Sequence, residues 1–297
     1  MLLRGRFPEG GIIDRIDKRL SRPFFHMCLP MPAEFLLTIP GAWFGNPLFS
    51  QTVMPLLVAA PQAKERSLLI TTVPLVAVGL GYWCKICWES LKTGEGIMKS
   101  YNLLSKKWIL AFPNLAMAVL ALADTPRTTA AHYISSWFCS QLLIEVMKGL
   151  AWRLRPVAAL ADELTAVPRH FRELSTVVGG VSQANLSFPS GDAAGGAIFA
   201  TVLAMGTPEL QGLPIAIASL CSLGRVYFHC HHVLDVVVGQ AIGSAVTFLI
   251  GRVLKPTWGH VIASQLVLLF LWKPVQRFKP HDGAKQELKP DALTKKT

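Results

Sequence analysis

Arg225-Val-Tyr-Phe-His-Cys-His231-His-Val-Leu-Asp235 is the stretch that decides the fold. It places an arginine, a histidine and an aspartate within an otherwise apolar part of the chain. Ionisable groups are costly in apolar surroundings, so in a membrane protein they indicate a functional site. The stretch therefore predicts a polar site at the edge of a membrane domain.

The composition also indicates a membrane protein. The chain has 297 residues, of which 52% are hydrophobic and 16% are charged, whereas soluble domains carry about 25% charged residues. The net charge is +11, and the basic residues cluster at the ends of apolar stretches. That placement is typical of cations that contact membrane lipids, and it excludes nucleic acid as the expected partner.

The predicted fold class is all-α: a polytopic membrane protein with a core of six transmembrane helices at residues 67–254. A span needs about 20 apolar residues, with tolerance for tilt and for protein-covered ends. The six candidate spans are Ser67–Trp88, Trp108–Ala123, Thr129–Trp152, Ala193–Met205, Leu210–Phe228 and Val233–Leu254.

Two further segments flank this core. Residues 1–66 form a basic N-terminal lead-in whose apolar part, 34–60, is interrupted by proline and glycine. Residues 255–297 contain an apolar stretch at 257–272 and a charged tail that is typical of disorder. Both apolar stretches are candidates for additional membrane-associated helices.

Two other stretches carry charge into the apolar core. Lys148-Gly-Leu-Ala-Trp-Arg-Leu-Arg155-Pro156 closes the third span, and Phe188-Pro189-Ser190-Gly191-Asp192 opens the fourth. With six crossings, all three stretches fall on one membrane face, and the N-terminus falls on the other. The N-terminal positive charges favour a cytoplasmic N-terminus, which predicts a site on the lumenal or exterior face.

The residue types of the three stretches suit a phosphate group. Lys148, Arg155 and Arg225 would repel one another unless an anion lay between them, and guanidinium groups match phosphate oxygens. Ser190 and Gly191 suit a helix start, where backbone N–H groups bind anions.

His231 and Asp235 supply the expected chemistry. Their spacing of i and i+4 puts them on one face of a helix. An aspartate that accepts from one imidazole nitrogen fixes the tautomer and leaves the other nitrogen to attack phosphorus. The pair therefore predicts a phosphohistidine intermediate that water hydrolyses.

Metal and redox chemistry are the weaker interpretations. His229, His231 and His232 are close in sequence, but neighbouring residues point in divergent directions, so no metal ligand is predicted. Cys84 and Cys87 form a C-x-x-C pair inside an apolar helix candidate, where small packing residues are the expected interpretation.

The patterns K-x6-R-P, P-S-G and R-x5-H-x3-D together resemble the type-2 phosphatidic acid phosphatase and vanadium haloperoxidase superfamily over residues 67–254. The resemblance implies a six-helix core and metal-independent removal of phosphate from lipid phosphates or isoprenoid diphosphates, with no cofactor. It also implies the site residues: Lys148, Arg155, Ser190, Gly191 and Arg225 as phosphate ligands, His231 as the nucleophile and Asp235 as its orienting group.

Two positions depart from the family pattern. Gly224 stands where the family has a serine, and Asp192 stands where it has the histidine that protonates the leaving oxygen. A carboxyl donates a proton only while it is protonated, and nearby cations favour its ionised form. Three outcomes stay open: Asp192 is a surrogate acid, the substrate is a diphosphate with a good leaving group, or catalysis is lost.

The sequence therefore predicts an integral membrane phosphohydrolase acting on phosphatidate-like or polyprenyl diphosphate substrates. The alternatives are a catalytically impaired member that binds phospholipid headgroups or scaffolds partners, and a lipid phosphotransferase. The sequence predicts no oligomeric state.

Overall fold

The computed structural model describes residues 10–45, 49–62, 67–93, 111–122, 127–164, 166–171, 186–210 and 212–277. These residues form helices and connecting loops, with an isolated bridge between Leu154 and Leu186. The all-α prediction is confirmed. The tail was expected to begin after residue 272, but α13 (Trp258–Arg277) continues through residue 277, because its helix is longer than the apolar stretch; residues 278–297 lie outside the described residues.

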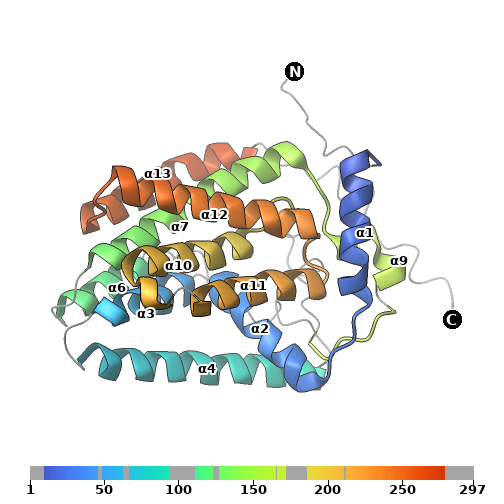
Figure 1. The fold of residues 1–297 in the computed structure, drawn as a ribbon, viewed down its shortest axis with the longest axis horizontal. Coiled ribbons are helices and arrows are strands. Elements are labelled where there is room, and N and C mark those ends of the chain that lie inside the picture. Colours follow the sequence, from blue (N-terminus) through green and yellow to red (C-terminus); the bar gives the residue numbers. More distant parts are fainter. Residues whose placement is uncertain are drawn as a thin grey trace.

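The six predicted core segments are all helical, with ends that differ by a few residues from the prediction. They are α4 (Ser67–Thr93), α6 (Ala111–Leu122), α7 (Thr128–Ala151), α10 (Gly191–Gly206), α11 (Gly212–Tyr227) and α12 (Val233–Val253). The additional helix expected at 257–272 is α13 (Trp258–Arg277), which packs along α7 (Figure 1).

The N-terminal segment forms several separate elements. They are α1 (Ile12–His26), α2 (Met31–Gly45), the π-helical turn Phe49–Val53, α3 (Met54–Ala59) and the short turn Ala60–Gln62. The π-helical turn is buried, and α2 packs against both α10 and α11. The interrupted apolar segment is thus a broken helical path inside the bundle.

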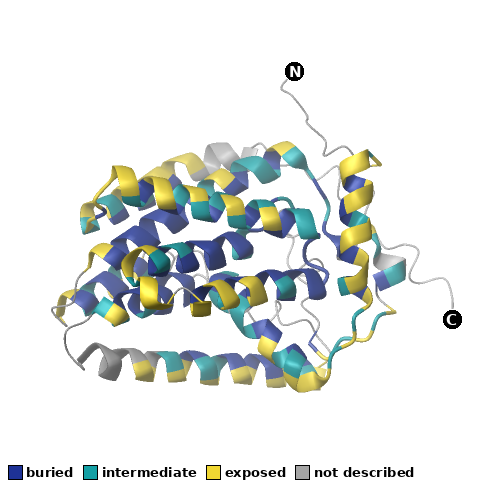
Figure 2. Cartoon of the chain, in the orientation of Figure 1, coloured by how far each residue is buried: buried dark blue, intermediate teal, exposed yellow. Residues whose placement is uncertain are grey.

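α10 is the central helix, buried on most sides (Figure 2). It packs against α2, α7, α11 and α12. Its closest neighbour is α12, because two glycines one turn apart leave room for the α10 backbone. A Cβ on Gly239 would lie 2.3 Å from the Ser190 carbonyl oxygen, and one on Gly243 would lie 2.4 Å from that of Ala194.

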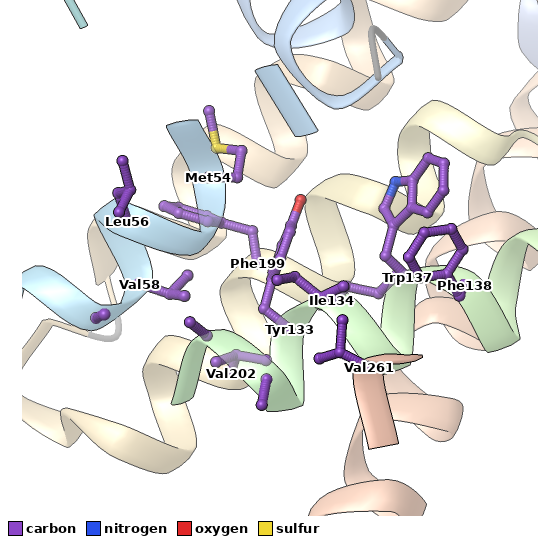
Figure 3. Close-up of a cluster of buried hydrophobic side chains, with 14 of the residues drawn as sticks. Met54, Leu56, Val58, Tyr133, Ile134, Trp137, Phe138, Phe199, Val202 and Val261 are labelled. Atoms are coloured by element: carbon purple, nitrogen blue, oxygen red, sulfur yellow. The ribbon is translucent and has the colours of Figure 1, made fainter. Parts of the chain in front are cut away.

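A continuous apolar core joins α10 to its neighbours (Figure 3). It combines residues from α3, α7, α10 and α13, which lie far apart in the sequence but adjacent in space. The labelled members are Met54, Leu56, Val58, Tyr133, Ile134, Trp137, Phe138, Phe199, Val202 and Val261. This core fixes the relative positions of the helices whose ends carry the charged motifs.

The bundle has two ends. At one end, called the motif end from here on, α10 and α12 begin and α7 and α11 finish, so the three charged stretches meet there. At the opposite end, the Gln62 side-chain amide donates to the Gly206 carbonyl oxygen over 3.3 Å, and Thr129 bonds the same glutamine.

The expectation that the N-terminus lies opposite the motifs is wrong. α1 lies across the motif end (Figure 1), where Asp17 accepts a hydrogen bond from the Leu234 amide at 2.8 Å. The reason is the broken path through α2 and α3, which runs from the motif end to Gln62 at the opposite end. This segment crosses the bundle once more than the six predicted spans allow. The additional crossing places α1 at the motif end instead of the opposite end.

By length and composition, α12 is the described helix that could cross a membrane unaided. Its 21 residues correspond to about 30 Å of helix, the thickness of a bilayer's hydrocarbon core. Four shorter apolar segments accompany it: Ala111–Leu122, Gly191–Gly206, Gly212–Tyr227 and Trp258–Leu271.

Candidate active site

The three charged stretches come together around one carboxylate. Asp192, in the first turn of α10, interacts electrostatically with Arg225, His231, Arg155 and Lys148. These residues come from the ends of α7 and α11 and from the loops that follow them. The structure thus gathers five of the six charged or titratable candidates around the start of α10, the sixth being Asp235 of α12.

Asp192 makes its closest contact with Arg225. Its Oδ2 lies 2.8 Å from Arg225 Nε, with Asp192 about one-fifth exposed and Arg225 almost fully buried. On the other side, a Cβ on Gly45 would lie 2.6 Å from Asp192 Oδ1. The end of α2 therefore covers the carboxylate, and the glycine there makes the approach sterically possible.

The start of α10 has the geometry of an anion-binding helix N-terminus. Ser190 is the N-cap, and its Oγ accepts from the Ala193 amide at 3.3 Å. The Ser190 amide donates to the Asp235 carbonyl oxygen at 2.9 Å, which ties this turn to α12. Gln141 of α7 donates to the Gly191 carbonyl oxygen at 3.2 Å. Sequence reasoning placed the helix start here but missed Gln141.

Lys148 and Arg155 reach the site by a different route from the one expected. Their spacing of seven residues would put them on one face of a continuous helix, but α7 ends at Ala151 and Trp152 takes a left-handed conformation with φ of 50°. Arg155 therefore lies beyond the helix, where it is the N-cap of α8 (Pro156–Ala159). Lys148 stays in the last turn of α7, paired with Glu145 at 3.1 Å.

His231 is buried, and the geometry fixes its tautomer. Its Nδ1 lies 2.8 Å from the carbonyl oxygen of Ser187. A carbonyl oxygen only accepts, so Nδ1 carries the proton and Nε2 keeps its lone pair. Burial, together with Arg155 and Arg225, lowers the pKa of His231 to about 4, although Asp235 acts to raise it. The imidazole is therefore neutral near pH 7, as a nucleophile requires.

Asp235 contacts His231 less directly than expected. The pair was predicted on one helix, but α12 begins at Val233, so His231 lies in the preceding loop. Their closest atoms, Nδ1 and Oδ2, are 3.8 Å apart, beyond hydrogen-bond distance. Asp235 Oδ2 instead accepts from the His232 amide at 2.8 Å and so caps α12. The carboxylate supports the loop that carries His231.

Arg153 connects this carboxylate to the N-terminal helix. Its guanidinium is buried and lies 2.7 Å from Asp235, 2.6 Å from Asp17 and 3.2 Å from Asp14. Although burial alone would lower it, Asp235 and Asp17 raise the pKa of Arg153. Sequence reasoning missed Arg153, Asp14 and Asp17 as members of this ionic network. Asp14 and Asp17 could have been found because they are acidic residues three apart in an otherwise basic segment.

The same network bears on metal binding. Asp17, His232 and Asp235 offer ligand atoms within 4.8 Å of one another. Arg153 Nη1, however, contacts both carboxylates and supplies the positive charge that a metal would bring. His229 points elsewhere, toward the Phe25 carbonyl oxygen at 3.0 Å. The group is better described as an arginine-centred ionic cluster than as a metal site.

Packing explains one departure from the family pattern. A Cβ on Gly224 would lie 2.7 Å from the backbone oxygen of Leu37 in α2. A serine there would collide with this helix, so glycine is required. The nearest serine, Ser222, lies two residues before Gly224. It faces α12, where its Oγ accepts a hydrogen bond from Gln240 at 2.8 Å.

Residues 129–258 match the family model described as the PAP2 superfamily. This segment belongs to the PAP2 superfamily. The match runs from the first turn of α7 to the start of α13 and contains every candidate site residue named from the sequence. PAP2 membership implies phosphoester hydrolysis of the phosphatase type. No curated protein and no solved structure matches the chain significantly.

Proposed function

We propose that the chain is an integral membrane PAP2 phosphohydrolase that removes phosphate from lipid phosphates or lipid diphosphates through a phosphohistidine. One observation carries the proposal. His231 is neutral, its Nδ1 donates to the Ser187 carbonyl oxygen, its Nε2 keeps a lone pair, and the cations Arg155 and Arg225 act on the ring from two separate parts of the chain. That is the arrangement needed for attack on a phosphorus atom.

The outer surface of the bundle supports the membrane part of the proposal. Large apolar side chains are exposed along α11, α12 and α13, where water would leave them unfavourably solvated. A lipid bilayer would cover them. These residues include Leu213, Ile215, Leu220, Val237, Phe248, Leu249, Ile262, Leu266 and Phe270.

The reaction follows from the residue chemistry. Phosphate oxygens would bind Arg225, Arg155 and the N–H groups that begin α10, with Lys148 adding a point charge. His231 Nε2 attacks phosphorus, the bond to the lipid oxygen breaks, and a phosphoimidazole forms. Water then attacks the same phosphorus, which releases inorganic phosphate and returns the electron pair to Nε2.

The leaving oxygen distinguishes the two substrate classes. A lipid alkoxide needs a proton when it leaves, and Asp192 occupies the position at which the family has its proton-donating histidine. Its pairing with Arg225 favours the carboxylate form, which cannot donate. When the terminal phosphorus of a lipid diphosphate is attacked, the leaving group is the lipid monophosphate, which needs little protonation. A lipid diphosphate is therefore the favoured substrate class.

The Asp192–Arg225 contact also favours a second candidate function. An internal carboxylate already occupies one of the expected phosphate ligands. A chain of this kind would bind lipid headgroups with reduced or no turnover. This candidate predicts phosphatidate binding that does not depend on His231.

Phosphate release decides between the two functions. Purified protein in detergent, with a metal chelator present, is given phosphatidate or a polyprenyl diphosphate, and His231→Ala is the control. We expect release from the diphosphate, a loss of at least about a thousandfold in the variant, and an acid-labile phosphoenzyme trapped only in the wild type. Equal background from both proteins on both substrates would overturn the enzymatic function.

A further inference from the structure

α1 carries three different stripes along its length. The inner stripe, facing the bundle, consists of Asp14, Asp17, Ser21 and Phe25, each no more than 3% exposed. The apolar stripe consists of Ile12, Ile13, Ile16 and Leu20, each more than half exposed. The basic stripe consists of Arg15, Lys18, Arg19 and Arg22. Residues three or four apart share a helix face, so the stripes follow separate sides.

The inner stripe holds the start of α12. Asp17 accepts from the Leu234 amide at 2.8 Å, and Ser21 Oγ accepts from the Val233 amide at 3.0 Å. These amides belong to the first turn of α12, where backbone donors have no partner within the helix. Through Arg153, the same stripe also reaches Asp235. The position of α1 therefore sets the position of the loop that carries His231.

The two outer stripes are unusual for a helix surrounded by water. A water-exposed helix normally buries its apolar residues and exposes its acidic ones, whereas α1 buries two aspartates and exposes four large apolar side chains. The helix also lies across the motif end (Figure 1), so its axis is parallel to the plane of a bilayer that the bundle would span.

Charge selects the occupant of this surface. The basic stripe would repel the same stripe of a second copy, so self-association is disfavoured. An anionic lipid surface attracts it, and each basic residue near such a surface strengthens binding about fivefold. Apolar side chains beside a basic face are the pattern of helices that lie in the headgroup layer.

We propose that α1 binds the anionic surface of the membrane through its apolar and basic stripes, and thereby holds the His231 loop in its working position. The contact of α1 with the membrane surface does not depend on the phosphohydrolase activity proposed above. Its effect on turnover rests on that proposed activity.

A lipid-quenching experiment tests the membrane contact. The exposed cysteines Cys28, Cys84 and Cys139 are replaced by serine, and Ile16→Cys is labelled with an environment-sensitive fluorophore. The full chain is placed in nanodiscs of phosphatidylcholine, with or without phosphatidylserine, and headgroup-level quenchers are added. Ala159→Cys, exposed at the same end but outside α1, is the control.

We expect quenching at position 16 to be several-fold stronger with phosphatidylserine, and to lose that dependence in Arg15→Gln/Arg19→Gln. The Ala159→Cys probe should respond equally in both discs. Absence of quenching at position 16 in both discs would overturn the proposal, because the stripe would then face water or a protein. A cross-link between position-16 cysteines of two copies as the main species would overturn it too.

Turnover of a short-chain, water-soluble phosphate substrate tests the link to the site without requiring substrate recruitment. Phosphatidylserine should raise kcat several-fold in the wild type and leave it unchanged in Arg15→Gln/Arg19→Gln. Asp17→Asn should lower kcat while leaving the quenching unaltered. If neither the wild type nor any variant releases phosphate, the proposed function fails. The quenching result still shows whether α1 contacts the membrane. Strong quenching with a kcat that ignores the lipid would overturn the link to the site.

Discussion

Asp192 is the residue on which the chemistry depends most. It stands at the start of α10 with its carboxylate 2.8 Å from Arg225 Nε. A carboxylate in this position cannot protonate a leaving group, and it competes with the substrate for the arginine. The first effect acts on the phosphate monoester reaction more than on the diphosphate reaction, because an alkoxide needs a proton from the enzyme to leave.

Replacing Asp192 by histidine should therefore restore a proton donor. We expect Asp192→His to raise kcat on phosphatidate by about a hundredfold or more, the usual contribution of a general acid, and to change kcat on a polyprenyl diphosphate much less. Asp192→Asn is the matched control, because it removes the charge without supplying a proton. A large loss of activity in both variants would show instead that Asp192 is itself the working acid.

The pKa of His231 predicts the acid limit of the reaction. Burial, with Arg155 and Arg225, lowers this pKa to about 4, so the imidazole is neutral above that pH and protonated below it. Protonation consumes the Nε2 lone pair. We expect kcat/KM, which reports the free enzyme, to fall as pH drops through about 4. A half-maximal loss near 6.5, the ordinary value for histidine, would contradict the burial of this side chain.

Among the elements, the contact between α10 and α12 sets the site. The Ser190 carbonyl oxygen lies where a Cβ on Gly239 would come within 2.3 Å, and the Ser190 amide bonds Asp235. The start of α10 and the start of α12 are therefore positioned by one close backbone contact.

Gly239→Ala tests that contact. A methyl group there must push Ser190 away, because backbone atoms cannot rotate out of its path. We expect the initial rate to fall at least about tenfold, with the thermal midpoint reduced and the protein still folded. Gly81→Ala in α4 is the control, since a Cβ there meets nothing within 4 Å and alanine favours helix. Equal rates for the two variants would contradict the role of the contact.

At the scale of the whole molecule, basic residues favour the motif end. Those described at this end include Arg15, Lys18, Arg19, Arg22, Arg153, Arg155 and Arg169, whereas the opposite end has Arg127, Arg252 and Lys255. Positive charge favours the cytoplasmic side of a membrane. The sequence analysis placed the N-terminal positive charges opposite the site and so predicted a lumenal or exterior site. Because α1 lies at the motif end, the same charges favour a site on the cytoplasmic face.

Glycosylation mapping tests this orientation. An acceptor sequence with a flexible spacer is inserted in the turn Pro208–Leu210 at the opposite end, or beside Val167 at the motif end. We expect the first to be glycosylated in cells and the second to stay unmodified, because only the lumenal side is exposed to the transferase. The reverse pattern would place the site on the lumenal or exterior face.

The sequence by itself was sufficient to predict the main helices and to identify the three charged motifs as one candidate site. Long apolar runs specify helices locally, so α7, α10 and α12 were predicted to within a few residues. Ser190 was predicted as a helix start because capping depends on neighbouring backbone groups alone. The motif spacings were sufficient to name the phosphate ligands and His231 as candidates.

The tertiary structure alone decided what holds those residues. Ser187 fixes the tautomer of His231 from 44 residues away, and Arg153 meets Asp14 across 139 residues. No local pattern encodes such contacts, because they depend on which helix ends meet. The side of α1 was also decided by packing. Prolines and glycines divide its following passage into α2, a π-turn and α3, so no continuous apolar run marked it as a crossing.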